Sequence, residues 1–360
     1  MDIKLAPAPP EEHIQSKRQR GLLLILAAAL ALAGVLLYRA RGLSFQWDLF
    51  FSTFAHVAWG WMSAAILVVF VTYIGRALRW QVMLWPIRQD ANLWRINTAT
   101  MIGFAAIVLL GRPGELVRPY LISVKEKTPF SAQMAAWLLE RILDLLAVLL
   151  IFGFALSYIP VHETHVGGAL QWVLRTGGYL VAGLGALALI LLIAFRNFSG
   201  ATETRILSAL SFLPEYYTRR IQKTLRAFAK GMEATRNTGY LLLLLGYTLL
   251  EWVAIVAVYY CIFSSFPITS GFSLADTLVF VGFVAFGSLI QIPGIGGGFQ
   301  VVAAVVLTEI FRIPLEQSTG LALLIWLITF VVVVPPGLIL AFHEGIHWRS
   351  LRQIPEDVAT

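Results

Sequence analysis

Charged side chains are scarce in this chain of 360 residues, because Asp, Glu, Lys and Arg together make up only 13% of it. A soluble globular protein carries about 25% charged residues, so the scarcity excludes an ordinary soluble domain. Hydrophobic residues reach 58%, and several apolar runs approach or exceed the ~20 residues that a helix needs to cross a bilayer. The composition therefore predicts an all-α, polytopic integral membrane protein.

Cysteine and the common catalytic motifs are scarce as well. Cys261 is the single cysteine, so an internal disulfide is excluded. The sequence has no nucleotide-binding loop, no serine elbow and no Asp-x-Asp cluster, and the pairs His162/His165 and His343/His347 lie outside any metalloprotease helix motif. We therefore expect no enzymatic activity, no metal and no cofactor.

Basic residues outnumber acidic ones, and the net charge is +7. They are dispersed among loops, which favours contact with anionic lipid headgroups over nucleic acid. Because cytoplasmic loops are rich in Lys and Arg, the tails 1–20 and 346–360 are expected in the cytoplasm, and Arg76 and Arg79 in a cytoplasmic loop. The domain between the tails, 21–345, includes an amphipathic cytoplasmic segment at 203–236, which is typical of a helix on the inner leaflet or of a solvated hairpin.

Eight apolar runs divide this domain: 21–38, 57–75, 96–110, 131–159, 168–195, 239–263, 277–311 and 318–342. Basic residues flank the run 96–110 on both sides, and it is short for a crossing. The run 277–311 begins and ends in segments placed outside. We therefore predict six full spans and two re-entrant helical hairpins that enter from opposite faces, with eight full spans as the alternative. Opposed broken helices also occur in transporters with inverted repeats; the halves show no convincing sequence similarity, so a repeat is left open.

Six charged side chains gather between two apolar runs, in the stretch 111–144: Arg112, Glu115, Arg118, Glu140, Arg141 and Asp144. Charges in such a setting are costly, which indicates a functional site or a structural ion-pair network. In the first interpretation arginines meet a lipid phosphate, which their planar fork suits. In the second, Glu140 and Asp144, on one helix face at a shallow cytoplasmic depth, pair with Arg112 or Arg118. We expect Arg112 and Arg118 to face a ligand while the acids hold Arg141.

Two further features lie in later runs. Glu251 is the only ionisable residue of 239–263 and lies near the middle of a bilayer, so it is expected to be neutral, paired or facing water. It is a candidate for proton coupling or gating, or a protonated acid bonded to a neighbouring helix. The glycine-rich turn PGIGGG at 293–298 permits close backbone approach to a ligand or tight packing at a hairpin tip. Its candidate residues are Pro293, Gly294, Gly296 and Gln300.

The order GRPGELVRPY, ERILDLLAVLL, PGIGGG and a final long apolar run resembles the transmembrane flippase domain of bacterial lysylphosphatidylglycerol synthases. That domain also occurs as stand-alone membrane proteins in bacteria and archaea, and the likeness covers about residues 20–345. The resemblance implies that the six charges above and Pro293, Gly294 and Gly296 are motif positions. The family often has Glu a few residues after the glycine turn, where this chain has Gln300. Since the synthase domain is absent, the resemblance implies lipid translocation without lipid synthesis.

The expected function is thus translocation of an anionic or phosphate-bearing lipid across the cell (inner) membrane. Two alternatives stay open: a transporter for a small soluble anion that uses the same arginines, and a non-transporting partner of an envelope-lipid enzyme. A homo-oligomer is equally open at this point. Nucleic acid is not an expected partner.

Overall fold

The computed structural model describes residues 45–158, 237–288, 291–292, 294 and 296–345, together with 176–177, 179, 181, 183–190, 193 and 222. The chain divides into two compact units, 1–49 and 50–360, and every element below lies in the second apart from α2 (Trp47–Ser52), which crosses the boundary. Several predictions lie outside the described residues: both tails, the first span at 21–38, most of the run 168–195 and, except for Gln222, the segment 203–236.

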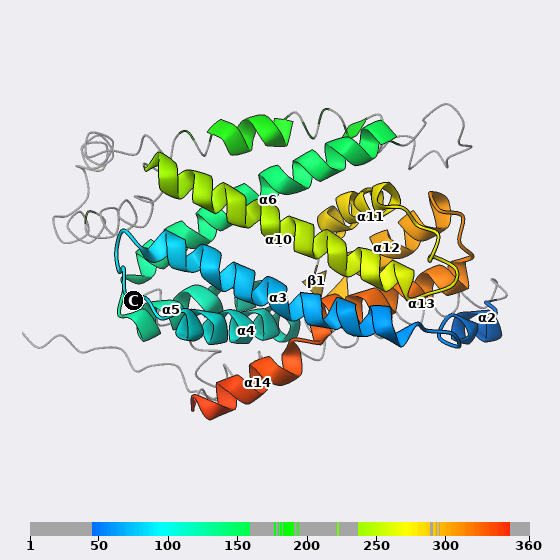
Figure 1. Cartoon of the computed structure of the whole chain (residues 1–360), viewed down its shortest axis with the longest axis horizontal. Helices are drawn as coiled ribbons and strands as arrows, with labels where there is room; N and C mark the ends of the chain where they lie inside the picture. The colour runs from blue at the N-terminus through cyan, green and yellow to red at the C-terminus, as the bar shows by residue number, and fades with distance from the viewer. Residues whose placement is uncertain are drawn as a thin grey trace, which may run out of the picture. The chain divides into compact units, whose positions relative to one another are not determined.

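The described part of the second unit is helical except for one short β pair (Figure 1). In chain order the elements are α3 (Trp59–Leu84), α4 (Leu93–Leu110), the 3-10 helix η1 (Arg112–Leu116), α5 (Val117–Glu126), α6 (Phe130–Tyr158), α10 (Thr238–Ser264), α11 (Leu274–Gly287), β1 (Gln291–Ile292), β2 (Gly296–Gly297), α12 (Gly298–Glu309), α13 (Leu315–Trp326), the π-helix η3 (Leu327–Val331) and α14 (Val334–His343). Four stretches of the described chain are long and apolar enough to cross a membrane: Trp59–Leu84, Leu93–Leu110, Thr238–Ser264 and Leu315–His343. The predicted α-helical, polytopic class is confirmed.

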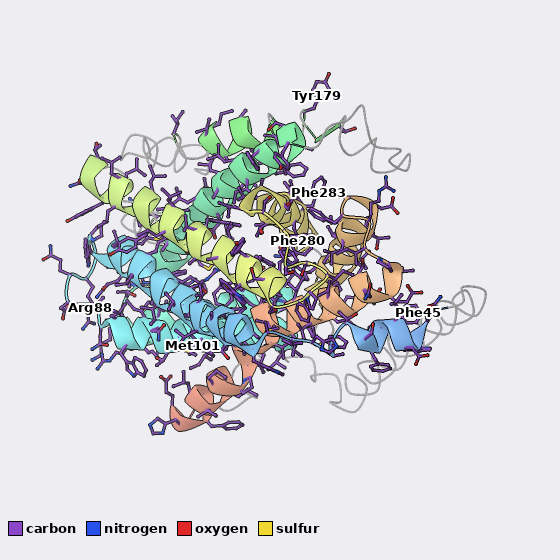
Figure 2. All side chains as sticks on the ribbon, turned by 45° about the vertical axis from the view of Figure 1, so that its right-hand side comes forward. Phe45, Arg88, Met101, Tyr179, Phe280 and Phe283 are labelled. Carbon is purple, nitrogen blue, oxygen red and sulfur yellow. The ribbon has the colours of Figure 1, made fainter. Side chains whose placement is uncertain are left out.

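The helices α3 and α10 form an antiparallel pair that lies across the other elements (Figure 1). The ring centroids of Trp61 and Tyr260 are 6.4 Å apart at one end of the pair, and those of Trp85 and Tyr240 are 5.7 Å apart at the other. Aromatic residues are enriched where a membrane helix meets the two interfaces. In the interior, Phe280 and Phe283 of α11 point among the helices, whereas Arg88 points away from them (Figure 2). The helices α4, α6 and α11 pack against this pair.

The length of α3 corrects the sequence analysis. The helix continues nine residues past the apolar run 57–75 and ends at Leu84, so Arg76 and Arg79 are helical rather than part of a cytoplasmic loop. The side chain of Arg79 is completely buried. Counting loop charges treats every arginine as solvated, and this fails where buried carboxylates neutralise the guanidinium groups.

Leu93–Glu126, here called hairpin 1, folds back on itself. The glycine Gly111 adopts φ 72° and ends α4, and α5 then returns along α4. A Cβ atom on Gly103 would lie only 2.6 Å from the Cβ of Arg118, so the two arms touch at a position where only glycine fits. Nearer the open end, Lys125 Nζ donates to Thr98 Oγ1 at 2.7 Å. The arm α4 has 18 residues, more than the apolar run predicted, so length alone does not decide between re-entry and crossing.

Leu274–Glu309, here called hairpin 2, is built in the same way. Its arms α11 and α12 approach at Gly287, where a Cβ would lie 2.8 Å from the Gly298 carbonyl oxygen. The turn between them carries the β1–β2 pair, in which Ile292 opposes Gly296. The backbone N–H of Gly294 donates to the carbonyl oxygen of Val108 in hairpin 1, at 2.8 Å. The two hairpins therefore meet tip to tip.

The two halves of this unit repeat one architecture in inverted orientation. The order α3, hairpin 1, α6 matches the order α10, hairpin 2 and the last helix, by which we mean Leu315–His343 (α13, η3 and α14). Both α6 and the last helix have 29 residues. Lys127 and Arg312 are the non-glycine residues of the described chain with positive φ, and each lies two residues before the proline, Pro129 or Pro314, that precedes the third helix. Because α3 and α10 run antiparallel, the halves are related by inversion, which the sequence alone left open.

Candidate functional site

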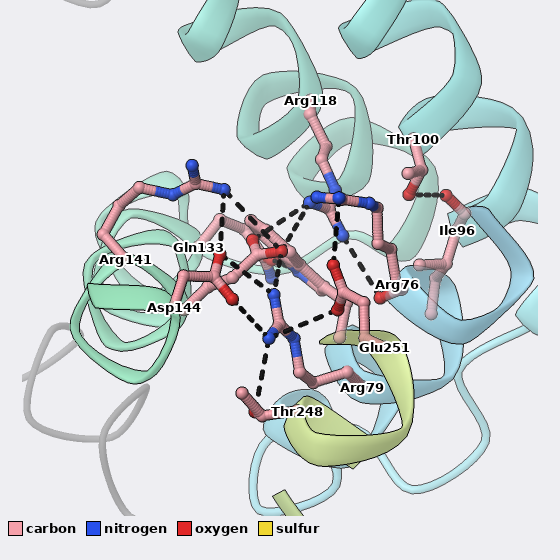
Figure 3. A network of polar contacts seen from close by, with 12 residues as sticks. Arg76, Arg79, Ile96, Thr100, Arg118, Gln133, Arg141, Asp144, Thr248 and Glu251 are labelled. Atoms are coloured by element: carbon pink, nitrogen blue, oxygen red, sulfur yellow. Dashed lines mark hydrogen bonds and ion pairs between the residues drawn. The ribbon is translucent and has the colours of Figure 1, made fainter. Parts of the chain in front are cut away.

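Arg79 is the centre of a buried arginine–carboxylate cluster. Its Nη2 lies 2.6 Å from Glu140 Oε1, and its Nη1 lies 2.7 Å from Asp144 Oδ1. Thr248 Oγ1 also accepts from Nη1, at 3.2 Å (Figure 3). One guanidinium therefore ties α3 to α6 and α10, through charge-assisted hydrogen bonds that are about twice as strong as neutral ones.

Arg118 enters the cluster from α5 in hairpin 1. Its Nη1 lies 3.0 Å from both oxygens of Glu140, and its Nη2 donates to the carbonyl oxygen of Arg76 at 3.2 Å. The guanidinium stacks over the Trp80 ring at 4.0 Å, a cation–π contact, and Trp80 Nε1 donates to Gln133 Oε1. With the residue 4% exposed, Arg118 lies in the interior. The alternative in which an acid pairs with it is confirmed, whereas its contact with a ligand stays a prediction.

Glu251 joins the same cluster from the middle of α10. It lies thirteen residues from each end of that helix. Its Oε1 is 3.1 Å from Arg76 Nη2 and its Oε2 is 3.2 Å from Arg79 Nη1, and its side chain is 1% exposed. Of the three possibilities open for Glu251, the paired one is confirmed, so it is not an isolated carboxylate. The cluster therefore links Glu140 on α6 to the midpoint of α10 through Arg79.

Arg141 is the exposed member of the cluster. Its contacts are the longest in it, at 3.5 Å from Nη2 to Asp144 Oδ2 and 3.8 Å to Glu140 Oε1. Its side chain is 40% exposed, against 1% for Arg79. Its Nε is buried and has no hydrogen-bond partner in the described part of the chain. Arg141 was expected to be held by the acids, but Arg79 and Arg118 take their short contacts and Arg141 is held only loosely.

The remaining charges of the first motif form a separate pair. Arg112 Nη1 bonds Glu115 Oε1 within η1, at the tip of hairpin 1, and the Arg112 side chain is half exposed. The expected pairing of Arg112 with Glu140 or Asp144 is not found. Gly114 of η1 packs directly on α4, where a Cβ atom would overlap the carbonyl oxygen of Ala106. Arg112 is therefore accessible to solvent, and its contact with a ligand stays a prediction.

The residues of the glycine-rich turn have structural roles in the described chain. Gly294 adopts φ 75° and makes the tip-to-tip hydrogen bond described above, and Gly296 pairs with Ile292. Gln300 Oε1 accepts the N–H of Gly297 at 2.7 Å and so caps the start of α12. Pro293 lies outside the described residues. A glutamine can make this cap as well as a glutamate, so Gln300 in place of the family's glutamate leaves the start of α12 capped.

A second, peripheral group of charges lies at the open end of hairpin 1. Lys125 Nζ is 2.6 Å from Glu344 Oε1, which ties α5 to the end of α14. Partial burial lowers the pKa of the Lys125 ammonium, and the hydrogen bond to Glu344 opposes that shift. Nearby, Arg88 Nε lies 3.3 Å from the buried carboxylate of Glu126. These pairs fasten the ends of elements to one another.

Sequence reasoning missed Arg76 and Arg79. An arginine pair three residues apart at the end of the apolar stretch GWMSAAILVVFVTYIG would have marked them, because a buried acid such as Glu251 requires a cation on a facing helix. Arg76 lies over the Phe104 ring at 4.6 Å and its side chain is 15% exposed. The cluster therefore holds four guanidinium groups, on Arg76, Arg79, Arg118 and Arg141, against three carboxylates, on Glu140, Asp144 and Glu251.

This arrangement can bind an anion. Among the described residues the cluster carries one formal positive charge in excess, and the exposed part of Arg141 is where an anion would reach it. No group of three or more His, Cys, Asp or Glu side chains in the described chain is placed to hold a metal ion.

The helical fold and the buried charges define a multi-pass membrane protein. Residues 22–337 match the family model described as the lysylphosphatidylglycerol synthase TM region, so the chain belongs to this family, which is linked to lipid translocation. No curated protein and no solved structure gave a significant match. The resemblance seen in the sequence motifs is thereby confirmed.

Proposed function

We propose that this protein is a lipid translocase that moves an anionic, phosphate-bearing lipid between leaflets, with no synthesis step. The observation that carries the proposal is the excess positive charge of the arginine–carboxylate cluster, exposed at Arg141 and tied to the middle of α10 through Glu251. A single phosphate accepts hydrogen bonds from the fork of one arginine. Membership of a family linked to lipid translocation supports the same substrate class.

The members of the cluster have different roles in this proposal. Arg79 and Arg118 hold α3, α5, α6 and α10 together and keep Glu140 charged. Arg141 binds the headgroup phosphate, and Arg76, the second most exposed of the four arginines, receives it along the cluster. Asp144, which is partly exposed beside Arg141, positions that guanidinium.

The proposal is tested by leaflet exchange of fluorescent phosphatidylglycerol in liposomes that contain the purified protein. We expect Arg141→Gln to slow exchange about tenfold, the effect of losing one charge-assisted hydrogen bond of about 1.5 kcal/mol. Arg88→Gln is the matched control, because Arg88 pairs with Asp90 and Glu126 outside the cluster. Exchange no faster than in protein-free liposomes would refute a translocase, and uptake of a soluble anion without lipid exchange would favour the anion transporter.

We also propose that both hairpins are re-entrant, which with the runs 21–38 and 168–195 gives six full spans. The tip-to-tip hydrogen bond between Gly294 and Val108 supports this, because both tips then lie inside the protein. Irregular backbone is tolerated at membrane depth only there or at a polar cavity. Tight folding of α5 onto α4 at Gly103 supports it for hairpin 1.

Single cysteines on a Cys261→Ser background test the topology with an impermeant maleimide applied to intact cells. We expect Asp90→Cys and Lys127→Cys, which flank hairpin 1, to be protected from the reagent. Ser270→Cys and Arg312→Cys, which flank hairpin 2, are expected to be labelled. All four residues are exposed in the structure. Labelling of only one member of either pair would show a full crossing and refute re-entry.

A further inference from the structure

The last helix is broken where its counterpart is continuous. In η3, Val332 N–H donates to Leu327 O, a π-type bond at 2.9 Å, and Thr329 Oγ1 donates to Ile325 O at 2.7 Å. Pro335 and Pro336 follow η3, and neither has a backbone N–H group to donate within the helix. The inverted-repeat counterpart α6 is one uninterrupted α-helix of the same 29-residue length. A π-type turn and a proline each bend a helix, and in the last helix the two are adjacent.

The two parts of the last helix are fastened to different hairpins. α13 packs along α12 of hairpin 2, and Phe330 in η3 meets Phe299 of α12 with ring centroids 5.2 Å apart. α14 packs on α4 of hairpin 1, so closely that a Cβ on Gly337 would lie 2.6 Å from the Ala105 Cβ. The Lys125–Glu344 ion pair, at 2.6 Å, fixes its far end to hairpin 1 as well.

On the other side of the unit, α6 joins the same two hairpins without a break. Near its start Glu140 bonds Arg118 of hairpin 1. Near its end Phe152 meets Phe283 and Phe286 of hairpin 2, with ring centroids 5.1 and 4.7 Å apart. The hairpins are thus joined along the continuous helix α6 on one side and along the interrupted helix α13–α14 on the other, and among the described residues a backbone hydrogen bond joins their tips.

We propose that the segment from Leu327 to Pro336 is a hinge, and that the hairpins separate on the side of the last helix while α6 holds them together on the other. Opening requires the tip bond between Gly294 and Val108 to break, and one neutral hydrogen bond costs less to break than an ion pair of the cluster. The gate lies beside α13 and α14, whose outer residues Leu323 and Ile339 are exposed and apolar. The hinge does not depend on the proposed function, but its use as a lateral entry for a lipid rests on that function.

Distances between two spin labels on the purified protein in nanodiscs test the hinge directly. Labels at Leu323→Cys and Ile339→Cys, on a Cys261→Ser background, span the break. The matched control carries labels at Leu138→Cys and Phe154→Cys on α6. In each helix the labels lie nine and twenty-five residues after the preceding proline, Pro314 or Pro129. We expect the distance distribution across the break to be at least about twice as wide as that on α6, or bimodal.

The variant with Pro335→Ala and Pro336→Ala restores two backbone donors and is expected to narrow the distribution across the break toward that of α6. A distribution across the break as narrow as the α6 control would overturn the hinge, as would a broad one that the double substitution leaves unchanged. If the variant fails to fold, the unsubstituted comparison between the two label pairs still decides.

The proposed function is separated from the hinge by measuring lipid exchange on the same preparations. If both hold, the double alanine variant exchanges lipid several-fold more slowly than the unsubstituted protein. A broad distance distribution in a protein that exchanges no lipid would leave the hinge standing and refute the translocase. A narrow distance distribution in a protein that exchanges lipid would refute the hinge and leave the translocase standing.

Discussion

Glu140 and Arg141 are neighbours in the chain and have opposite environments. Glu140 has no exposed surface and holds two guanidinium groups at 2.6 and 3.0 Å. Arg141 is 40% exposed and has only long contacts. One turn of α6 therefore presents a buried anion to the interior and a partly exposed cation outward, because successive helical residues are about 100° apart.

Glu140→Gln is expected to destabilise the protein by about 3–5 kcal/mol, since it leaves Arg79 and Arg118 buried without their shared carboxylate. Thermal or denaturant unfolding of the purified protein measures this. Arg141→Gln serves as the control and should change stability by no more than about 0.5 kcal/mol, because its contacts are long and exposed. Equal losses in the two variants would contradict the division of roles.

At the scale of elements, close contact between helices depends on glycine at a few positions. Gly103, Gly287 and Gly337 are sites where a Cβ would come within 3 Å of a neighbouring helix or arm. Two of these lie inside the hairpins and the third joins α14 to hairpin 1. Helix association in a membrane relies on such backbone approach, because burial from water contributes little there.

Gly337→Ala is expected to destabilise the protein by about 1–3 kcal/mol, because the new methyl group overlaps Ala105 and the Met101 carbonyl and forces α14 away from α4. Gly246→Ala is the matched control. Gly246 lies inside α10, and a Cβ added there would have no neighbouring atom within 4 Å, so alanine should be neutral or stabilise by about 0.5–1 kcal/mol. Unfolding measurements that rank the two variants the other way would refute the packing argument.

At the scale of the whole described unit, the inverted halves share a backbone plan and differ in charge. Asp144 and Thr329 occupy corresponding places, fifteen residues beyond Pro129 and Pro314. Asp144 bonds the buried Arg79, whereas Thr329 donates to the carbonyl oxygen of Ile325 in its own helix. Six of the seven charged members of the network therefore lie in the first half, and Glu251 on α10 is the member from the second half, which contains the hinge.

A disulfide between Val108→Cys and Gly294→Cys, on the Cys261→Ser background, is expected to stop lipid exchange, because it locks the tips that their backbone hydrogen bond already brings together. Reduction should restore exchange in the same sample. As a control, Lys125→Cys and Glu344→Cys joined by a bismaleimide should remain active, since both residues belong to the hairpin 1 side. Full exchange by the oxidised tip variant would show that the tips do not separate.

Much of the fold followed from apolar periodicity and a few special residues. The runs 131–159 and 239–263 correspond closely to α6 and α10, because long apolar stretches have one stable solution in a membrane. Gly111 and the PGIGGG turn marked both hairpin tips. The end of α3 was wrong, since composition cannot distinguish an arginine in a loop from one paired inside a helix bundle.

The sequence by itself determined that this is a multi-pass helical protein of a recognisable family, with a charged motif from Arg112 to Asp144 and an acid at Glu251. Only the tertiary structure decided the pairing. It brought Arg76 and Arg79 of α3 to acids on α6 and α10, fixed Arg118 inside and left Arg141 exposed. It also revealed the inverted halves. Side-chain type and spacing can be read along the chain. Ion pairing and repeat symmetry depend instead on which helices are in contact, and packing in three dimensions determines that.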